Sequence, residues 1–262
     1  MSIRAEGGPS RLVISQPMFM PWRGMFEQIR LSNQFVFYDD VQLPLGGGKG
    51  RGFSTRVQIK TERGSEWLTL PVDRAGKGKQ LISEARFAHM DWKEGHLSKI
   101  RQAYKQAAFF DEVYETAVLP IYQMETDSLC EFCMDSTRRL ASSLGLSPVW
   151  HVSSALQTGH DTAASERVLE ICRRLGASEY ISGLGAMQYL DYAIFDAAGV
   201  RVSYMRYEMQ PYAQLHGSFT PYVSIIDMLF CIGFSATAAS LQSGALFWKN
   251  WPAGDDGRPV AH

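Results

Sequence analysis

The sequence contains no uninterrupted apolar run long enough to cross a membrane, and no apolar segment typical of a secretory signal lies near its first residues. Cysteine is scarce as well. Four cysteines among 262 residues are too few for a disulfide scaffold in a chain of this length, and they are consistent with reduced thiols. We therefore expect a cytoplasmic protein with no membrane span.

Charge of one sign is not in excess either. Lys and Arg total 26 and Asp and Glu total 27, which gives a formal net charge of −1. A chain with this balance has no long-range field to hold a nucleic-acid backbone or an anionic bilayer. We therefore expect a small-molecule partner and no nucleic acid, and the oligomeric state stays open.

Familiar catalytic motifs are missing too. The chain has no Gly-x-x-x-x-Gly-Lys-Ser/Thr phosphate-binding loop, and Ser182 lacks the flanking glycines of the Gly-x-Ser-x-Gly elbow. Cys130 and Cys133 have the Cys-x-x-Cys spacing, but they lie inside a predicted helix and no second cysteine pair accompanies them. We interpret them as packing residues and predict no metal site.

Short apolar runs alternate with helical patterns along the chain. Leu12–Ser15 and Phe35–Tyr38 have the length of buried strands, and a helix that we expect to start at Pro21 lies between them. Further strands are predicted at Tyr180–Ile181 and near Val200–Tyr207, each after a helical stretch. This alternation predicts an α/β domain with a mostly parallel sheet.

Two additions interrupt the alternation. Strand-like runs on either side of Glu62-Arg63-Gly64 predict an inserted β-hairpin, and the basic stretch Gly46–Gly52, with Lys49 and Arg51, is either a lid or a surface loop. A helical middle section follows. We expect residues 11–251 to form one domain between two polar tails, 1–10 and 252–262. The predicted helices span Asp91–Ala107, Asp127–Leu144, Thr162–Leu175 and Gln188–Ala198, with a last one from Ser224 to Gly233.

Polar residues follow several of the predicted strands. In an open α/β sheet, ligands bind beyond the carboxyl ends of the strands, so we expect these residues to converge on one pocket. The helix start near Pro21 adds unpaired N–H groups and a partial positive charge, which suit a phosphate, although many ordinary helices open in the same way. The candidate ligand-binding residues are Gln16, Pro17, Trp22, Arg23, Gln42, Ser182 and Gly183.

Three titratable residues are candidates for catalysis. Asp39 and Asp40 follow the second strand, and because neighbouring side chains point to opposite faces of a strand, only one of them is expected to enter a site. That carboxylate is either a general base or part of a solvated strand end. His96 lies on the apolar stripe of its helix, where it is either an acid or base or a hydrogen-bonded core residue.

Several short blocks resemble one known family. They include Ile14-Ser15-Gln16-Pro17, Pro21-Trp22-Arg23-Gly24, Asp39-Asp40-Val41-Gln42 and Tyr180-Ile181-Ser182-Gly183. Through these and other blocks, residues 12 to 233 resemble the WbqC-like family. Arg56 also matches the family pattern, whereas Met18 and Met25 stand where many members are expected to have tyrosine.

The resemblance implies a role in O-antigen or related polysaccharide biosynthesis, in which an acyl or aminoacyl group is attached to an amino sugar. The early strand followed by Pro-Trp-x-Gly is also similar to the nucleotidylyl-transferase superfamily. That similarity implies a Rossmann-like domain and a nucleotide-type ligand, either ATP or a nucleotide sugar.

On this hypothesis the protein is an amide-forming transferase. Gln16, Arg23 and Arg56 position the ligand, one of the three acid–base candidates accepts the amine proton, and Ser182 with Gly183 holds an oxyanion. The alternative is a non-catalytic protein of a biosynthetic complex that binds a nucleotide sugar or a partner through its aromatic side chains.

Overall fold

The computed structural model of the chain describes residues 8–44, 52–74, 76, 78–159 and 164–252. Several predictions fall on residues outside these ranges. They concern most of the two tails, most of the loop at Gly46–Gly52, and the helix cap Thr162. None of the helices in the described part of the chain has the length and apolar character of a membrane span.

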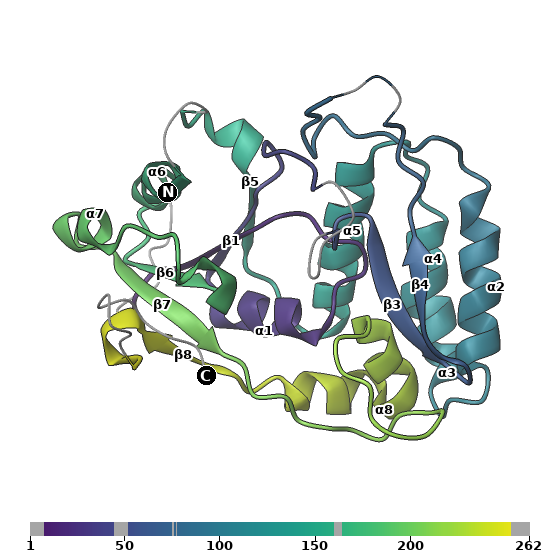
Figure 1. Cartoon of the computed structure of the whole chain (residues 1–262). Coiled ribbons are helices and arrows are strands. Elements are labelled where there is room, and N and C mark those ends of the chain that lie inside the picture. Colours follow the sequence, from purple (N-terminus) through teal and green to yellow (C-terminus); the bar gives the residue numbers. More distant parts are fainter. Residues whose placement is uncertain (1–7, 45–51, 75, 77, 160–163, 253–262) are drawn as a thin grey trace, which may run out of the picture.

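Six strands form the main sheet, in the order β5-β2-β1-β6-β7-β8 (Figure 1). All neighbouring pairs are parallel except β7 and β8. The chain is therefore an α/β protein with a mostly parallel sheet, as predicted. The strands are β1 (Arg11–Ser15), β2 (Gln34–Phe37), β5 (Val149–Val152), β6 (Glu179–Ser182), β7 (Arg201–Arg206) and β8 (Gly244–Phe247).

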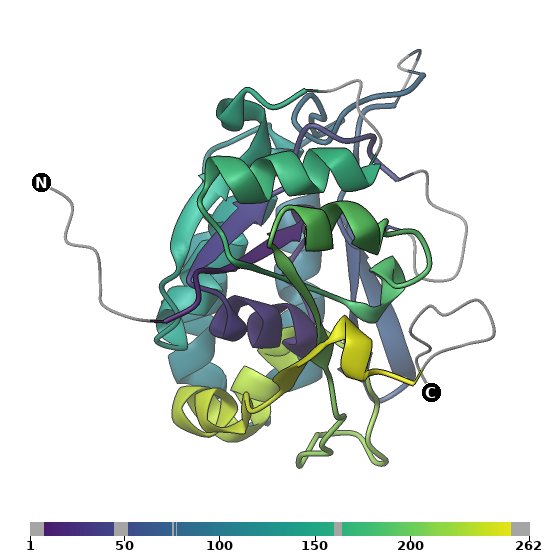
Figure 2. The same ribbon diagram turned by 90° about the vertical axis from the view of Figure 1, so that its left-hand side faces the viewer.

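Helices cover both faces of the sheet and build the rest of the molecule. In Figure 2 the green helices α6 and α7 lie in front of the sheet and the purple helix α1 lies behind them. The described helices are α1 (Arg23–Leu31), α2 (Trp92–Tyr104), α3 (Phe110–Val113), α4 (Leu119–Tyr122), α5 (Leu129–Ser143), α6 (Ala164–Arg174), α7 (Tyr192–Ala197) and α8 (Ile225–Ser240).

Strand residues alternate between two hydrophobic cores, because successive side chains of a strand point to opposite faces. Leu12 and Tyr180 belong to the core that contains residues of α6 and α7. Their neighbours Val13 and Ile181 belong to the larger core that contains residues of α1, α2, α5 and α8. The two faces of β1 and β6 thus join the sheet to the helices on both sides.

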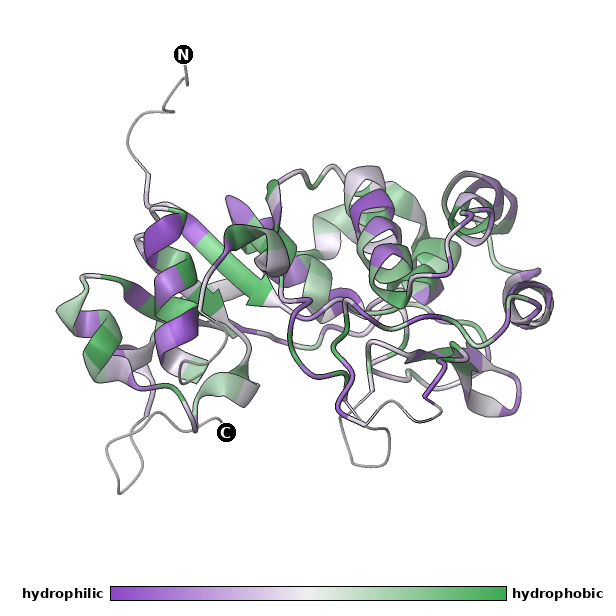
Figure 3. Ribbon diagram, turned by 90° about the horizontal axis from the view of Figure 1, so that it is seen from above, coloured by the Kyte–Doolittle hydropathy of each residue, from purple (hydrophilic) through white to green (hydrophobic). Residues whose placement is uncertain are grey.

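The predicted hairpin forms a separate two-stranded sheet, β3 (Arg56–Thr61) and β4 (Gly64–Thr69). It packs beside α2, and the short helices α3 and α4 follow, joined by a π-helical turn at Tyr114–Val118. Seen from above, the main sheet occupies one end of the molecule, and the hairpin and α2 occupy the other (Figure 3). The cleft described below lies between these two ends.

The helix predicted to start at Pro21 begins two residues later. Trp22 is the N-cap residue of α1 and has an extended backbone, with φ −72° and ψ 165°. Pro21 and Trp22 are extended because they pair with the segment before α8: Ile225 N donates to Pro21 O at 3.0 Å, and Trp22 forms an isolated bridge with Ser224. The helix therefore begins at Arg23, because Pro21 and Trp22 pair with the segment before α8.

The helix predicted to stop at Gly233 continues to Ser240. Gly233 instead marks a kink inside α8, with φ +76°. The ring of Phe109 packs against it, and a Cβ on Gly233 would lie 2.8 Å from that ring. Phe109 N also donates to Phe230 O at 3.1 Å, which satisfies a carbonyl near the kink.

Candidate functional site

A cleft of about 830 Å³ opens at the carboxyl ends of β1, β6 and β7. It lies where the strand order reverses, because β2 and β5 lie on one side of β1 and β6 lies on the other. Ser15 and Gln16 reach it from the end of β1, and Ser182 and Gly183 reach it from the end of β6. Its volume falls within the range of about 300–1,000 Å³ that is typical of small-molecule pockets.

The start of α1 forms one wall of this cleft. Trp22, Gly24 and Gln28 line it, so the first part of the helix borders the cleft, including the N-terminal end with its partial positive charge. A Cβ on Gly24 would lie 2.2 Å from the Trp22 ring. Glycine at this position therefore allows the indole to fold back over the first turn of the helix.

Tyrosine hydroxyls supply many of the other polar groups in the cleft. Burial raises the pKa of Tyr38, Tyr180, Tyr189 and Tyr207, so these hydroxyls keep their protons at neutral pH. None of the described residues that line the cleft carries a charged side chain. The cleft therefore offers neutral hydrogen-bond donors and a helix N-terminus.

Asp39 and Asp40 do not line the cleft but lie in a buried polar network. The Asp39 carboxylate accepts hydrogen bonds from Ser154 N at 3.0 Å and Ser154 Oγ at 2.7 Å. Ser153 Oγ lies 2.9 Å from Asp39 Oδ1 and 2.5 Å from Asp40 Oδ1, and Arg167 forms a buried ion pair with Asp40. These contacts describe a structural role, and general-base catalysis by either carboxylate stays a prediction.

His96 lies in the helical core, outside the cleft. Its Nε2 donates to Thr69 O at 3.1 Å, and the Tyr122 hydroxyl lies 3.3 Å from Nδ1. The ring packs against Phe19 and Trp92, and burial lowers the pKa of His96 to about 4, although the Thr69 carbonyl acts in the opposite direction. The contacts are those of a neutral, hydrogen-bonded core residue, and its catalytic role also stays a prediction.

Another buried carboxylate anchors the segment that leads to the far wall of the cleft. Asp227 on α8 accepts hydrogen bonds from the Tyr212 hydroxyl at 2.7 Å and from Gln214 Nε2 at 2.9 Å. The buried amine of Lys60 donates to Ser218 O at 2.6 Å. These bonds attach residues 212–218 to β3 and α8.

Comparison with known proteins places the chain in a family. The sequence model of the WbqC-like protein family matches residues 16–239. The chain belongs to the WbqC-like protein family. An uncharacterised protein of Mycobacterium tuberculosis, Rv1507c, is 33% identical over 239 residues, which cover 86% of this chain and 95% of that relative. No solved structure matches the chain.

The cleft brings together part of the ligand-binding set predicted from the WbqC-like blocks, namely Gln16, Trp22, Ser182 and Gly183. Arg23 follows Trp22 directly but is turned away from the cleft. Its guanidinium is 3.3 Å from the Glu27 carboxylate, donates to the Gln210 carbonyl at 3.3 Å and also donates to the Ser240 carbonyl. In this arrangement Arg23 ties α1 to distant parts of the chain.

The remaining predicted residues of the WbqC-like blocks also lie outside the cleft. Arg56 is on the hairpin, where its guanidinium lies 4.4 Å from the centre of the Trp67 ring. Gln42 is exposed and pairs with Leu81 in an isolated bridge, and Pro17 is buried beside the end of β1. Direct contact of these residues with a cleft ligand stays a prediction.

Most of the lining residues were not among the candidates, including Tyr38, Tyr207, Gln28 and Tyr222. Tyr38 directly precedes Asp39 at the end of β2, and Tyr207 follows β7, so the strand-end rule applied to both. Gln28 lies one helical turn after Gly24 on the same face of α1. Tyr222 had no comparable signal, because a loop brings it to the cleft.

Proposed function

We propose that the protein binds a phosphorylated, nucleotide-type ligand, such as a nucleotide-linked sugar, in the cleft at the carboxyl ends of β1, β6 and β7. The observation that carries this proposal is the N-terminus of α1 at the cleft wall, with no carboxylate among the described lining residues. Backbone N–H groups and the helix dipole favour an anion at this point, and no neighbouring negative charge opposes it.

The strand order supports the same proposal. Numbered along the chain, the six strands of the main sheet stand in the order 3-2-1-4-5-6, which is the order of the doubly wound sheets that bind dinucleotides. We therefore infer a Rossmann-like sheet whose last strand, β8, runs antiparallel. In such sheets the ligand lies at the point where the strand order reverses, and this is where the cleft opens.

Calorimetric titration with ribose 5-phosphate and with UDP-glucosamine tests the proposal. We expect both to bind and the variant Gly183→Val to bind each at least tenfold more weakly, since a side chain there enters the cleft. Gly183 has unstrained dihedral angles, and a Cβ would meet only the end of the Gln28 side chain, at 3.1 Å, so the variant should fold.

Gly95→Val is the matched control for this experiment. Gly95 is exposed on α2, and a Cβ there would have no atom within 4 Å, so ligand affinity should not change. Absence of binding by either compound to the folded wild-type protein would overturn the proposed function. Equal weakening by both variants would show that the cleft is not the binding site.

An amide-forming transfer is the second candidate, and the placement of Tyr38 favours it. Its hydroxyl is kept protonated by burial, and the Arg167 guanidinium lies 4.9 Å from the centre of its ring. A protonated hydroxyl beside a positive charge is suited to donating a hydrogen bond to the oxyanion that forms when an amine attacks an acyl carbonyl. UDP-glucosamine as the amine and an acyl thioester as the donor would then give an amide and a free thiol.

Mass spectrometry of UDP-glucosamine incubated with acetyl-coenzyme A measures this transfer. We expect Tyr38→Phe to slow amide formation about 10²–10³-fold, the usual loss for one oxyanion donor. Tyr114→Phe is the control, because Tyr114 also contacts an arginine, Arg101 at 2.7 Å, but lies outside the cleft. Equal rates in wild type and Tyr38→Phe would remove Tyr38 from the reaction.

A further inference from the structure

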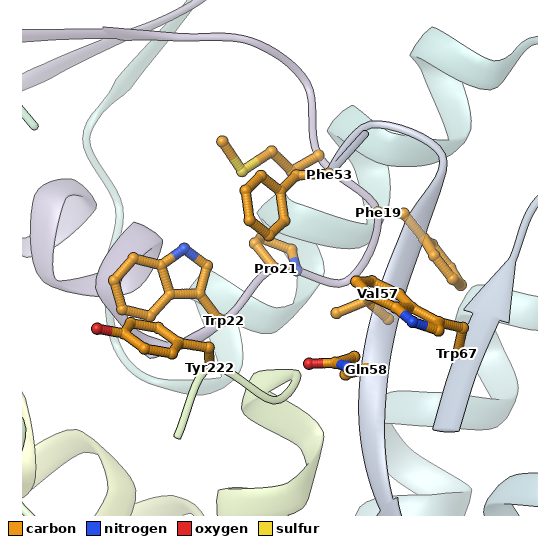
Figure 4. A pocket seen from close by; sticks show the side chains of 9 residues that line it. Phe19, Pro21, Trp22, Phe53, Val57, Gln58, Trp67 and Tyr222 are labelled. Atoms are coloured by element: carbon orange, nitrogen blue, oxygen red, sulfur yellow. The ribbon is translucent and has the colours of Figure 1, made fainter. Parts of the chain in front are cut away.

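A smaller cavity of about 220 Å³ adjoins the cleft. The two share Met18, Trp22, Phe53 and Tyr222, so one ligand can extend from the cleft into the cavity. Trp22 and Tyr222 form one wall and Trp67 of the hairpin stands on the other (Figure 4). We call this cavity the aromatic slot. Because it is smaller than typical whole-ligand pockets, it suits one group of a ligand.

The walls of the aromatic slot are held in place before any ligand binds. Ser224 Oγ donates to Met20 O at 2.7 Å and Ser224 N donates to Gln58 O at 2.8 Å, so one buried residue joins the loop before α1 to the hairpin. Met20 and Tyr222 both have positive φ angles, of 39° and 61°. Residues other than glycine rarely adopt this conformation, and it often marks a functional site.

Tyr222, whose φ angle is positive, packs its ring against Trp22. The Tyr222 ring lies edge-on to Trp22, with 5.3 Å between ring centres, and more than half of the Tyr222 side chain is exposed to solvent. Trp67 is also 40% exposed, and Arg56, which does not line the slot, covers its ring at 4.4 Å. Both walls therefore keep aromatic surface exposed to solvent, and on Trp67 this is the part of the ring that Arg56 does not cover.

An amide side chain stands among the aromatic residues of the slot. Gln58 lines it, and its amide makes no hydrogen bond to any other described residue. In Figure 4 the side-chain oxygen of Gln58 points toward the space beside Tyr222. The amide carries both a donor and an acceptor, and no charged side chain is among the described residues of the slot. The occupant is thus a flat, uncharged group with a donor and an acceptor on its edge.

We propose that the aromatic slot binds the nucleobase of the ligand whose phosphates lie at the start of α1. The inference rests on the proposed function. Aromatic side chains stack on the flat faces of bases, and a glutamine amide pairs with a donor and acceptor on a base edge. Trp22 belongs to both cavities and joins the base to the phosphates.

Titration with uridine and adenosine 5′-monophosphates, compared with ribose 5-phosphate, tests this assignment. We expect at least one nucleotide to bind about tenfold more tightly than ribose 5-phosphate, which lacks only the base. Trp67→Leu should remove this tenfold advantage and leave the affinity for ribose 5-phosphate unchanged. Gln58→Leu, at a half-buried position, should reduce the difference in affinity between the two nucleotides. Phe109→Leu, another exposed aromatic residue outside both cavities, should change none of these affinities.

The outcomes separate this inference from the proposed function. If ribose 5-phosphate and both nucleotides bind with equal affinity, the phosphate site stands and the base assignment is wrong. An advantage for nucleotides that survives in folded Trp67→Leu and Gln58→Leu would place the base elsewhere and overturn the inference. If none of the three compounds binds, both the proposed function and the inference fail.

Discussion

Replacing Arg167 with Met is expected to lower the free energy of unfolding by about 3–5 kcal/mol, because the Asp40 carboxylate would stay buried without the Arg167 guanidinium. The Arg167 side chain is 6% exposed and that of Asp40 is 3% exposed, so water has little access to either group. Urea unfolding followed by circular dichroism measures the change.

Two further variants make this test specific. The double variant Arg167→Met with Asp40→Leu should be more stable than Arg167→Met alone, because it removes the buried carboxylate as well. Arg101→Met breaks an exposed pair with Glu94 and should change the free energy of unfolding only slightly, because water screens exposed charges. A loss of that small size for Arg167→Met would show that solvent reaches the Asp40 pair.

Acidification is expected to destabilise the protein through His96. Burial lowers the pKa of His96 to about 4, whereas the unfolded chain binds this proton near pH 6.5. A depressed native pKa stabilises the fold fully above about pH 6.5, and this stabilisation is lost as the pH falls toward 4. The loss amounts to about 3 kcal/mol, from the linkage between proton binding and folding.

Comparison of variants isolates this contribution from the carboxylates, which titrate over part of the same range. The free energy of unfolding of His96→Gln, measured from about pH 7 to pH 4, should fall by about 3 kcal/mol less than that of the wild type. Parallel curves for the two proteins would show that the native state accommodates a charged His96.

The buried strands were the most predictable part of the fold. β1, β2, β6 and β7 are short apolar runs, and their pattern reflects burial on both faces of the sheet. The edge strands β5 and β8 were not predicted, because exposed or half-buried residues make them up and no comparable apolar run exists. Side chains of edge strands are less buried than those of central strands. Edge strands therefore lack the apolar runs by which the central strands were predicted.

The candidate site was predictable where the chain itself places residues at a strand end or, for Trp22, at the start of α1. Gln16 and Ser182 follow β1 and β6, and both line the cleft. Asp39 follows β2 in the same way, yet Ser153 and Ser154, more than a hundred residues later, bind its carboxylate. Hydrogen-bond partners from distant segments determine which polar residues at the strand ends reach solvent. The local sequence pattern around a strand does not contain this information.

The central position of β1 also bears on when the cleft can form during synthesis. Arg11 at the start of β1 pairs with Glu179, 168 residues later, so the first strand stays unpaired on that side until most of the chain exists. Contacts between such distant residues form slowly, because a long loop must close before they stabilise anything. The wall that carries Tyr222 is made later still. A growing chain on the ribosome would therefore complete the cleft only near the end of translation.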